Sequence, residues 1–280
     1  MNPTAAPALP AAPLRVAAAQ TESVPGDVAG NARRAAALTA RAADGGARVL
    51  VLPELHLCGY DLPGLAAAPD RHEVSADALG RVADQRLDPL AEAAADHSVT
   101  VLAGAAVRRD DGTLTNSVLA VAPAGAPVVA YDKQHLWHAD ERGLFTPGGR
   151  GAAVVVEGWR LALGICYDLS FPEHARAAAL AGAHGYLCPG AFAAGNEHRA
   201  AVYLAARALE NTMYALFVNP VGGPAHRPCA GGTTVHGPGG ETAGRLPAAR
   251  EDILMADLDP RALTEVRGFL RMLEECRAGG

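Results

Sequence analysis

The stretch WRLALGICYDLSFPEHARAAALAGA, residues 159–183, contains a short apolar run, a turn and a helix-forming segment in that order. Residues 159–168 are short and mostly apolar, as expected of a buried β-strand. Pro172 stands where the first turn of a helix would begin, and Gly182 stands near its end. The stretch therefore predicts a strand followed closely by a helix, which is the repeating unit of an α/β fold.

The same alternation of strand-like and helix-like segments continues along the rest of the chain. Neither a break in composition nor a long linker divides the sequence, so we predict a single α/β domain over residues 14–280 with two layers of sheet and helices outside. Pro89 is expected to break or restart the second helical segment. Strands are expected at 14–20, 47–54, 99–107, 115–122, 127–133, 152–157, 185–190, 213–220, 231–237 and 252–259, and helices at 28–43, 76–97, 197–211 and from 260 onward.

Length and composition exclude several classes of protein. Half of the 280 residues are hydrophobic, which is enough to bury a large core. The formal net charge is -6 and no basic cluster stands out, so no nucleic-acid partner is expected. No apolar run approaches the roughly 20 residues of a membrane span, so no membrane association is expected either.

The first 13 residues and the cysteines indicate the compartment. The opening MNPTAAPALPAAP, residues 1–13, lacks the regions of a secretion signal, and we expect a flexible tail there. The five cysteines are scattered and form no CxxC pair, which argues against a disulfide scaffold or a zinc ribbon. We therefore expect a cytoplasmic protein.

Three reactive side chains share one local context, the end of a predicted buried strand. Glu54 ends VLVLPE, Lys133 ends VVAYDK, and Cys166 nearly ends LALGICYD. Such strand ends are where α/β folds collect reacting groups. Lys133 is also the only lysine beside 23 arginines. Because surface roles tolerate arginine, a single retained ammonium indicates a role that the wider guanidinium cannot fill, such as pointing one charge at a developing oxyanion.

Each of these three residues has an ordinary explanation when it is taken alone. A lone cysteine is usually a buried small hydrophobe, a glutamate after a proline is usually a solvated strand end, and a lone lysine can be a surface residue left by drift. Together they form a hydrolytic set that needs neither histidine nor metal. A thiolate can attack a carbonyl or nitrile carbon, a carboxylate can carry the protons, and an ammonium can stabilise the oxyanion.

Three segments resemble the catalytic blocks of the nitrilase superfamily, whose members are also called carbon–nitrogen hydrolases. These segments occur in the family's order and at compatible spacings, and the resemblance extends from about Arg15 to Arg267. They are LPELHLCGY (52–60), YDKQHLW (131–137) and GICYDLSFPEHAR (164–176). Further similar segments are ERGLFTPG (141–148), GAFAAGNEH (190–198) and LAARALENTMYALFVNPVGG (204–223).

The resemblance implies a fold, an assembly and a set of roles. The fold is a four-layer αββα sandwich, usually paired into a homodimer or a larger homo-oligomer. Cys166 is implied to be the nucleophile, Glu54 the general base and acid, and Lys133 the oxyanion stabiliser. Glu141 would position Lys133 or the substrate amine, and the backbone N–H of Tyr167 would be a second oxyanion donor. Neither a cofactor nor a metal is implied.

The residues after the nucleophile indicate the branch of the family. Nitrile-cleaving members typically have Trp-Glu at this point, whereas Tyr167 and Asp168 resemble the amidase and carbamoylase branches. Many members that act on carboxylate-bearing substrates have an arginine where Ser170 stands, and serine cannot hold a carboxylate through two hydrogen bonds. The sequence therefore leans away from an ω-amidase or an N-carbamoyl-D-amino-acid hydrolase, although Arg142 or Arg199 could substitute from another loop.

Several other residues are weaker candidates. His135 and His138 form an HxxH pair without a third ligand at a sensible spacing, so no metal site is predicted. Cys58 and Cys188 are expected to be core residues, and Asp168 could be a second acid. Aromatic residues are the candidates for substrate contact, although aromatics at strand ends are often core: Tyr60, Trp137, Tyr167 and Phe192.

Two classes of function remain open. The first is a thiol amidohydrolase that releases ammonia or an amine from a small linear amide or N-carbamoyl compound through a cysteine acyl-enzyme. Hydrolysis of a nitrile to an acid, or acyl transfer to an acceptor other than water, would use the same chemistry. The second class is a non-catalytic scaffold of the same fold. The intact set of Glu54, Lys133 and Cys166 favours the enzyme, because a binding module has no need for all three.

Overall fold

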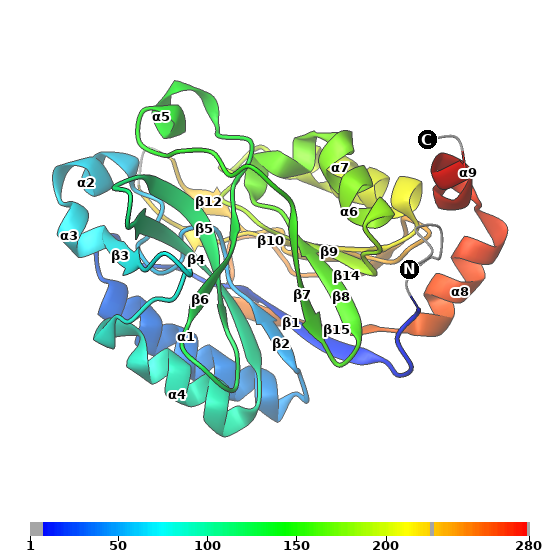
Figure 1. Cartoon of the computed structure of the whole chain (residues 1–280), viewed down its shortest axis with the longest axis horizontal. Coiled ribbons are helices and arrows are strands. Elements are labelled where there is room, and N and C mark those ends of the chain that lie inside the picture. The colour runs from blue at the N-terminus through cyan, green and yellow to red at the C-terminus, as the bar shows by residue number, and fades with distance from the viewer. Residues whose placement is uncertain (1–7, 225–226, 279–280) are drawn as a thin grey trace.

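The computed structural model describes residues 8–224 and 227–278 of the chain. Two β-sheets lie face to face, and helices cover the outer face of each sheet (Figure 1). The helices over the first sheet are α1 (Val28–Asp44) and α4 (Asp88–His97), and those over the second are α6 (Pro172–Leu180) and α7 (Glu197–Asn211). This order of layers confirms the expected αββα sandwich.

The first sheet consists of strands from the N-terminal half of the chain and one C-terminal strand. They are β1 (Leu14–Gln20), β2 (Val49–Val51), β3 (Glu73–Ala76), β4 (Thr100–Arg109), β5 (Leu114–Val121), β6 (Val128–Asp132) and β15 (Asp252–Leu258). Their order is β15-β1-β2-β4-β5-β6, with β3 paired to β4. Since β2 and β4 are parallel, and β5 is antiparallel to both β4 and β6, β2 and β6 run in the same direction. Their carboxyl ends therefore lie at the same edge of the sheet.

The second sheet has a parallel centre, in which β8, β9 and β10 run in one direction. Its strands are β7 (Ala152–Val156), β8 (Trp159–Leu163), β9 (Gly185–Pro189), β10 (Tyr214–Val218), β13 (Thr234–His236) and β14 (Thr242–Arg245). A short ribbon of β11 (Val221–Gly222) and β12 (Cys229–Ala230) lies apart from both sheets. The remaining helical segments are α2 (Leu62–Ala67), α3 (Pro69–His72), η1 (Gln85–Leu87), α5 (His138–Arg142), η2 (Cys166–Ser170), α8 (Pro260–Phe269) and α9 (Met272–Ala278).

Alternation along the strands builds two cores. In β1, Val16 and Ala18 belong to the core between the sheets, whereas Ala17 and Ala19 belong to the core under α1 and α4. Successive side chains of a strand point to opposite faces, so the central strands are buried on both sides. This burial explains why the sequence shows continuous apolar runs in place of a regular alternation with polar residues.

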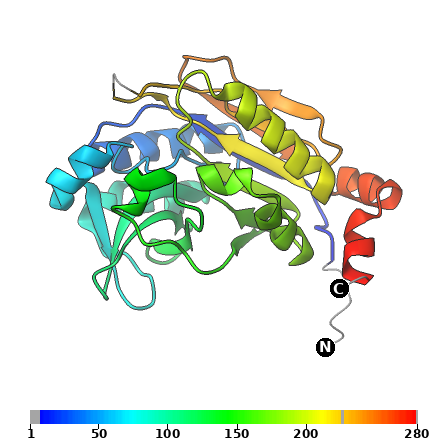
Figure 2. The ribbon, with the colours of Figure 1, turned by 90° about the horizontal axis from the view of Figure 1, so that it is seen from above.

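Residues 159–183 fold as predicted. Strand β8 runs into η2 and then into α6, which has Pro172 in its first turn. Figure 2 shows α8 and α9 at one end of the molecule, beside the four layers. The terminal helix predicted from Pro260 begins there as α8, and the chain leaves the helical conformation at Leu270 and Arg271 before α9 begins.

The helix predicted over residues 76–97 is wrong in its first half. Residues 77–80 make a turn, Arg81 and Val82 form isolated β-bridges, and helix α4 begins only at Asp88, after η1, with Pro89 in its first turn. The reason is local, because the Asp77 carboxylate accepts hydrogen bonds from the backbone N–H groups of Leu79 and Arg81, at 2.9 and 2.8 Å. An aspartate that binds the backbone just ahead of it favours a turn over a helix.

Part of the tail predicted over residues 1–13 lies outside the described residues, namely residues 1–7. In the described part, Leu9 packs against the core between the sheets. Trp159 Nε1 also donates a hydrogen bond of 2.9 Å to the Ala12 carbonyl. Within residues 8–224 and 227–278, no helix has both the length and the apolar character needed to cross a membrane.

Gly104 sets how closely β4 approaches the loop that contains Glu54. A Cβ atom at this position would lie 2.3 Å from Leu55 N and 2.4 Å from Pro53 O, and neither backbone atom can easily move away. We expect Gly104→Ala to lower the free energy of unfolding by roughly 1–3 kcal/mol, as overpacking does. Urea titrations measure this change. Gly149→Ala is the control, because its Cβ would meet nothing within 4 Å. Equal stability of the two variants would contradict this account.

Candidate active site

The strand ends bring Glu54, Lys133 and Cys166 together from the two sheets. Glu54 follows β2, Lys133 follows β6, and Cys166 follows β8. Lys133 Nζ lies 2.6 Å from Glu54 Oε1. The charges of Glu54 and Lys133 both act on the pKa of the Cys166 thiol, as expected of groups that share one site. The structure thus places the Lys133 ammonium against the Glu54 carboxylate, with the Cys166 thiol near enough for both charges to act on it.

Lys133 is buried between two carboxylates. Its Nζ contacts Glu54 Oε1 at 2.6 Å and both oxygens of Glu141 at 2.8 Å, and all three side chains are 0% exposed. Burial alone would lower the pKa of Lys133, but the charges of Glu54, Cys166 and Glu141 raise it well above its ordinary value. The amine is therefore held in its charged form inside the protein.

Glu54 has one oxygen that is held and one that is free. Its Oε1 accepts hydrogen bonds from Lys133 Nζ and, at 2.8 Å, from Asn116 Nδ2. Its Oε2 is buried and has no hydrogen-bond partner among the residues the structure describes. Burial raises the pKa of Glu54, and the charge of Glu141 adds to that effect, while Lys133 and Asn116 oppose it. Glu54 is thus fixed in position and able to take up a proton.

Glu141 holds Lys133 in place. Its carboxylate accepts a hydrogen bond from the Tyr60 hydroxyl at 2.6 Å and another from the Trp137 backbone N–H at 2.7 Å, in addition to those from Lys133. Both oxygens are therefore engaged. The side chain comes from the short helix α5, so it ties that helix to the loop that follows β6.

Cys166 stands at a sharp turn between β8 and η2. Its φ is +48°, in the left-handed region that residues other than glycine rarely adopt. A conformation of this kind costs on the order of 1–3 kcal/mol and occurs preferentially at functional sites. The thiol is only 6% exposed. Burial raises its pKa well above the ordinary value, the charges of Glu54 and Glu141 add to this, and Lys133 opposes it. At neutral pH the resting thiol is therefore protonated and needs a base.

Asp168 fixes the turn that contains Cys166. Its carboxylate accepts hydrogen bonds from the backbone N–H groups of Ile165 and His135, both at 2.9 Å, and from the Tyr131 hydroxyl at 2.7 Å. Although burial alone would raise its pKa, the hydrogen bond from the His135 side chain and the other polar contacts hold it below the ordinary value. Asp168 therefore connects the loop after β8 to the loop after β6, and it does not line the cavity beside Cys166.

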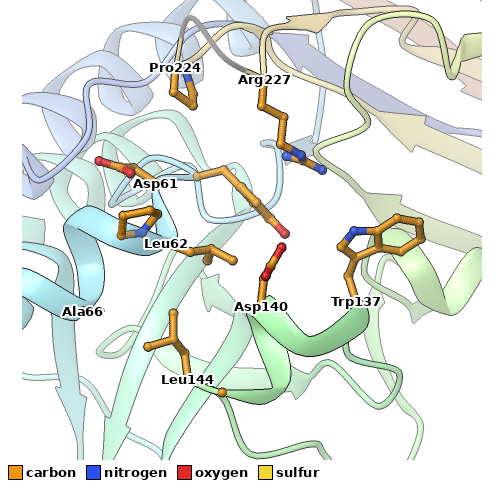
Figure 3. A pocket seen from close by; sticks show the side chains of 11 residues that line it. Asp61, Leu62, Ala66, Trp137, Asp140, Leu144, Pro224 and Arg227 are labelled. Atoms are coloured by element: carbon orange, nitrogen blue, oxygen red, sulfur yellow. The ribbon is translucent and has the colours of Figure 1, made fainter.

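Cys166 opens onto a cavity of about 130 Å³ that adjoins a larger pocket of about 460 Å³. The two share Trp137 and Arg227. Figure 3 shows the larger pocket, with both of these residues labelled. The small cavity is lined by Trp137, Cys166, Tyr167, Phe192, Ala193, Asn196, Arg199 and Arg227. The larger pocket is lined by Tyr60, Asp61, Leu62, Pro63, Ala66, Trp137, Asp140, Gly143, Leu144, Pro224 and Arg227. All four aromatic residues predicted to contact substrate thus lie around these two spaces.

The weaker histidine and cysteine candidates from the sequence do not line either pocket. The His135 ring is bonded to Asp168 at 2.8 Å, and the His138 ring stacks on Trp137 with ring centroids 3.9 Å apart. No group of three metal-ligating side chains occurs in the described part of the chain. Cys58 and Cys188 are buried in the two hydrophobic cores.

Comparison with known proteins identifies the family. Residues 15–268 match the carbon-nitrogen hydrolase family. A Pseudomonas protegens protein described as a hydrolase in the pqqF 5′ region is 34% identical over 265 residues, which cover 94% of this chain and 89% of the relative. An omega-amidase of Mus musculus is 29% identical over 270 residues, with 92% of each chain covered.

Solved structures agree with this assignment. A variant of the amidase from Nesterenkonia sp. AN1, in complex with butyramide, superposes with a TM-score of 0.78 and 27% identity, covering 92% of this chain and 95% of the other. The chain therefore belongs to the carbon–nitrogen hydrolase family, within the nitrilase superfamily. It is an enzyme of the amidase type.

Lys133→Met would leave Glu54 and Glu141 buried without a counter-charge. We expect the free energy of unfolding at neutral pH to fall by about 3–5 kcal/mol. Lys133 opposes the rise in the pKa of Glu54 that burial causes, so without the ammonium the folded-state pKa of Glu54 would lie further above its unfolded value. The loss of stability should therefore grow as the pH rises through the interval between the unfolded and folded pKa values, and shrink as the pH falls below it.

Urea titrations of Lys133→Met at several pH values measure this dependence. Arg48→Met is the control, because Arg48 and Glu157 form an ion pair on the surface, with side chains 43% and 49% exposed. The control is expected to lose little stability. A loss in Lys133→Met that is small, or that does not change with pH, would contradict the buried charge cluster.

Proposed function

We propose that this enzyme is a thiol amidohydrolase that cleaves the C–N bond of a small linear amide or N-carbamoyl compound through an acyl-enzyme on Cys166. The observation that carries the proposal is Glu54 Oε2, a buried carboxylate oxygen without a hydrogen-bond partner among the described residues, whereas Glu54 Oε1 and both oxygens of Glu141 are held. The relatives support it, because one structure of the Nesterenkonia amidase has the acetamide moiety of fluoroacetamide added covalently at its active-site cysteine.

Acylation begins with transfer of the Cys166 thiol proton to Glu54. The thiolate sulfur then forms a bond to the substrate carbonyl carbon, and the carbonyl π electrons move to oxygen. The protonated Glu54 gives its proton to the leaving nitrogen as the C–N bond breaks, so that ammonia or an amine departs and a thioester remains. The raised pKa of Glu54 suits both steps, because its carboxyl group must first accept a proton and then release it.

The oxyanion of the tetrahedral intermediate needs fixed donors. An ammonium has three N–H donors, so Lys133 can bind Glu54 and Glu141 and still direct one N–H at the oxyanion. The backbone N–H of Tyr167 is the second donor in this proposal. Glu141 acts through Lys133, since its own oxygens are occupied by Tyr60, Trp137 and Lys133.

Deacylation uses the same carboxylate. Glu54 removes a proton from a water molecule, whose oxygen attacks the thioester carbon, and the thiolate leaves and recovers a proton from Glu54. The net reaction adds one water across the C–N bond. A cavity of about 130 Å³ beside Cys166 favours a small acyl group. The cytoplasmic location and the homodimer or larger assembly remain predictions from the sequence.

Turnover of a substrate panel tests this proposal. Short amides, N-carbamoyl compounds and nitriles are incubated with the protein, and both ammonia and acid are quantified. We expect amides or carbamoyl compounds to be hydrolysed, and Cys166→Ala to stay folded while losing at least about 10³-fold in kcat/KM. Cys188→Ala is the control. Cys188 is another buried thiol, and its replacement should leave the rate of turnover unchanged.

The possible outcomes separate the alternatives. Direct conversion of nitriles to acids in preference to amides would favour a nitrilase. Turnover that survives in Cys166→Ala would exclude this residue as the nucleophile. A folded protein that hydrolyses no member of the panel would favour a non-catalytic scaffold.

A further inference from the structure

The cavity beside Cys166 is lined by two guanidinium groups and, among the described residues, by no carboxylate. Arg199 comes from the first turn of α7, and Arg227 comes from the loop between β11 and β12. Two separate segments of the chain therefore direct positive charge at the space that the thiol faces. An acidic side chain that could neutralise them is missing from that lining, although the chain as a whole is acidic.

Arg199 is positioned by aromatic rings. Its guanidinium carbon lies 5.4 Å from the ring centroid of Trp137 and 5.2 Å from that of Phe192. Its Nε is buried and has no hydrogen-bond partner in the described part of the chain. Leaving a buried charged donor unpaired is costly. The rings fix the plane of the guanidinium without using its N–H groups, and the structure records no hydrogen bond from the Arg199 Nη groups to another described residue, so the Nη groups are available to a ligand.

Arg227 is held in a similar way but retains free donors. Its guanidinium carbon lies 4.5 Å from the ring centroid of Tyr60, and one N–H of Nη2 is donated to the Ala191 carbonyl at 3.0 Å. No ion pair to Arg227 is present within residues 8–224 and 227–278. Figure 3 shows Arg227 and Trp137 reaching toward each other from different parts of the chain. The guanidinium therefore stands at the boundary of the small cavity and the larger pocket.

We infer that Arg199 and Arg227 form a carboxylate-binding subsite, so that the enzyme acts on small amides or carbamoyl compounds that themselves carry a carboxylate. This inference rests on the proposed function and names its substrate class. Guanidinium groups bind carboxylates through paired, charge-assisted hydrogen bonds, and a fixed plane improves that geometry.

A carboxylate-bearing substrate is the opposite of what Ser170 indicates in the sequence. Ser170 argues against a carboxylate substrate only if the arginine must come from that position. In the structure Ser170 lines neither pocket, whereas Arg199 and Arg227 line the cavity from elsewhere. Arg142, the other arginine considered from the sequence, is exposed on α5 and also lines neither pocket.

Matched pairs of substrates test the subsite. Succinamate and butyramide share a four-carbon amide skeleton and differ by a carboxylate in place of a methyl group. N-Carbamoyl-β-alanine and N-propylurea form the corresponding pair with the substituent on the nitrogen side. We expect kcat/KM to be about 10- to 100-fold higher for the charged member of at least one pair, mainly through KM, as charge-assisted hydrogen bonds imply. The pair that shows the preference identifies the side that carries the carboxylate.

Variants assign the preference to the two arginines. Arg199→Gln and Arg227→Gln should each reduce the ratio of charged to neutral kcat/KM toward 1 by raising KM for the charged substrate, and Arg199→Lys should recover part of it. Arg142→Gln is the control and should leave the ratio unchanged. An equal or lower kcat/KM for the charged members, or a ratio that both glutamine variants leave intact, would overturn the inference while the amidase function stands.

Binding separates failure of the subsite from failure of the function. If the wild-type protein hydrolyses neither amides nor N-carbamoyl compounds, the proposed function fails, and calorimetry on Cys166→Ala then tests the subsite alone. Tighter binding of succinamate than of butyramide, or of N-carbamoyl-β-alanine than of N-propylurea, would support it. Equal affinity within both pairs would overturn it.

Discussion

The buried contact of Lys133 with Glu54 and Glu141 is the interaction on which the site depends. Two carboxylates share one ammonium away from water. Burial raises the pKa of Glu54, and the charge of Glu141 adds to the rise, while Lys133 opposes it. The ammonium in turn stays charged. A positively charged donor and a carboxyl group able to exchange a proton are thereby kept beside a thiol, as the proposed hydrolysis requires.

The fold serves this contact by fixing the ends of strands. The parallel directions of β2 and β6 place Glu54 and Lys133 at one edge of the first sheet, and the close packing of Gly104 against the loop of Glu54 holds that loop down. Asp168 binds the turn of Cys166 to the chain beyond Lys133. The two sheets therefore act as one rigid support for three side chains that lie far apart in the sequence.

The sequence predicts the parts of the site that follow strong local patterns. Glu54, Lys133 and Cys166 each lie at or near the end of an apolar run. Lys133 is also the only lysine of the chain, which singles it out as a candidate. Asn116 and Arg227 were not predicted, because their contacts join segments that are distant in the chain and neither follows a periodic pattern. The early start predicted for α4 failed for a different reason, since the hydrogen bonds of one aspartate outweigh the apolar pattern of the segment.

Rapid-quench mass spectrometry of the acyl-enzyme tests the central claim most directly, with wild type compared with Glu54→Gln. Glutamine keeps the shape of the side chain and can still accept hydrogen bonds from Lys133 and Asn116, but it cannot take the thiol proton. The account predicts an adduct with the mass of the acyl group on Cys166 in the wild type, and acylation slower by at least about 10²-fold in the folded variant. Acylation at an equal rate in both proteins would contradict it.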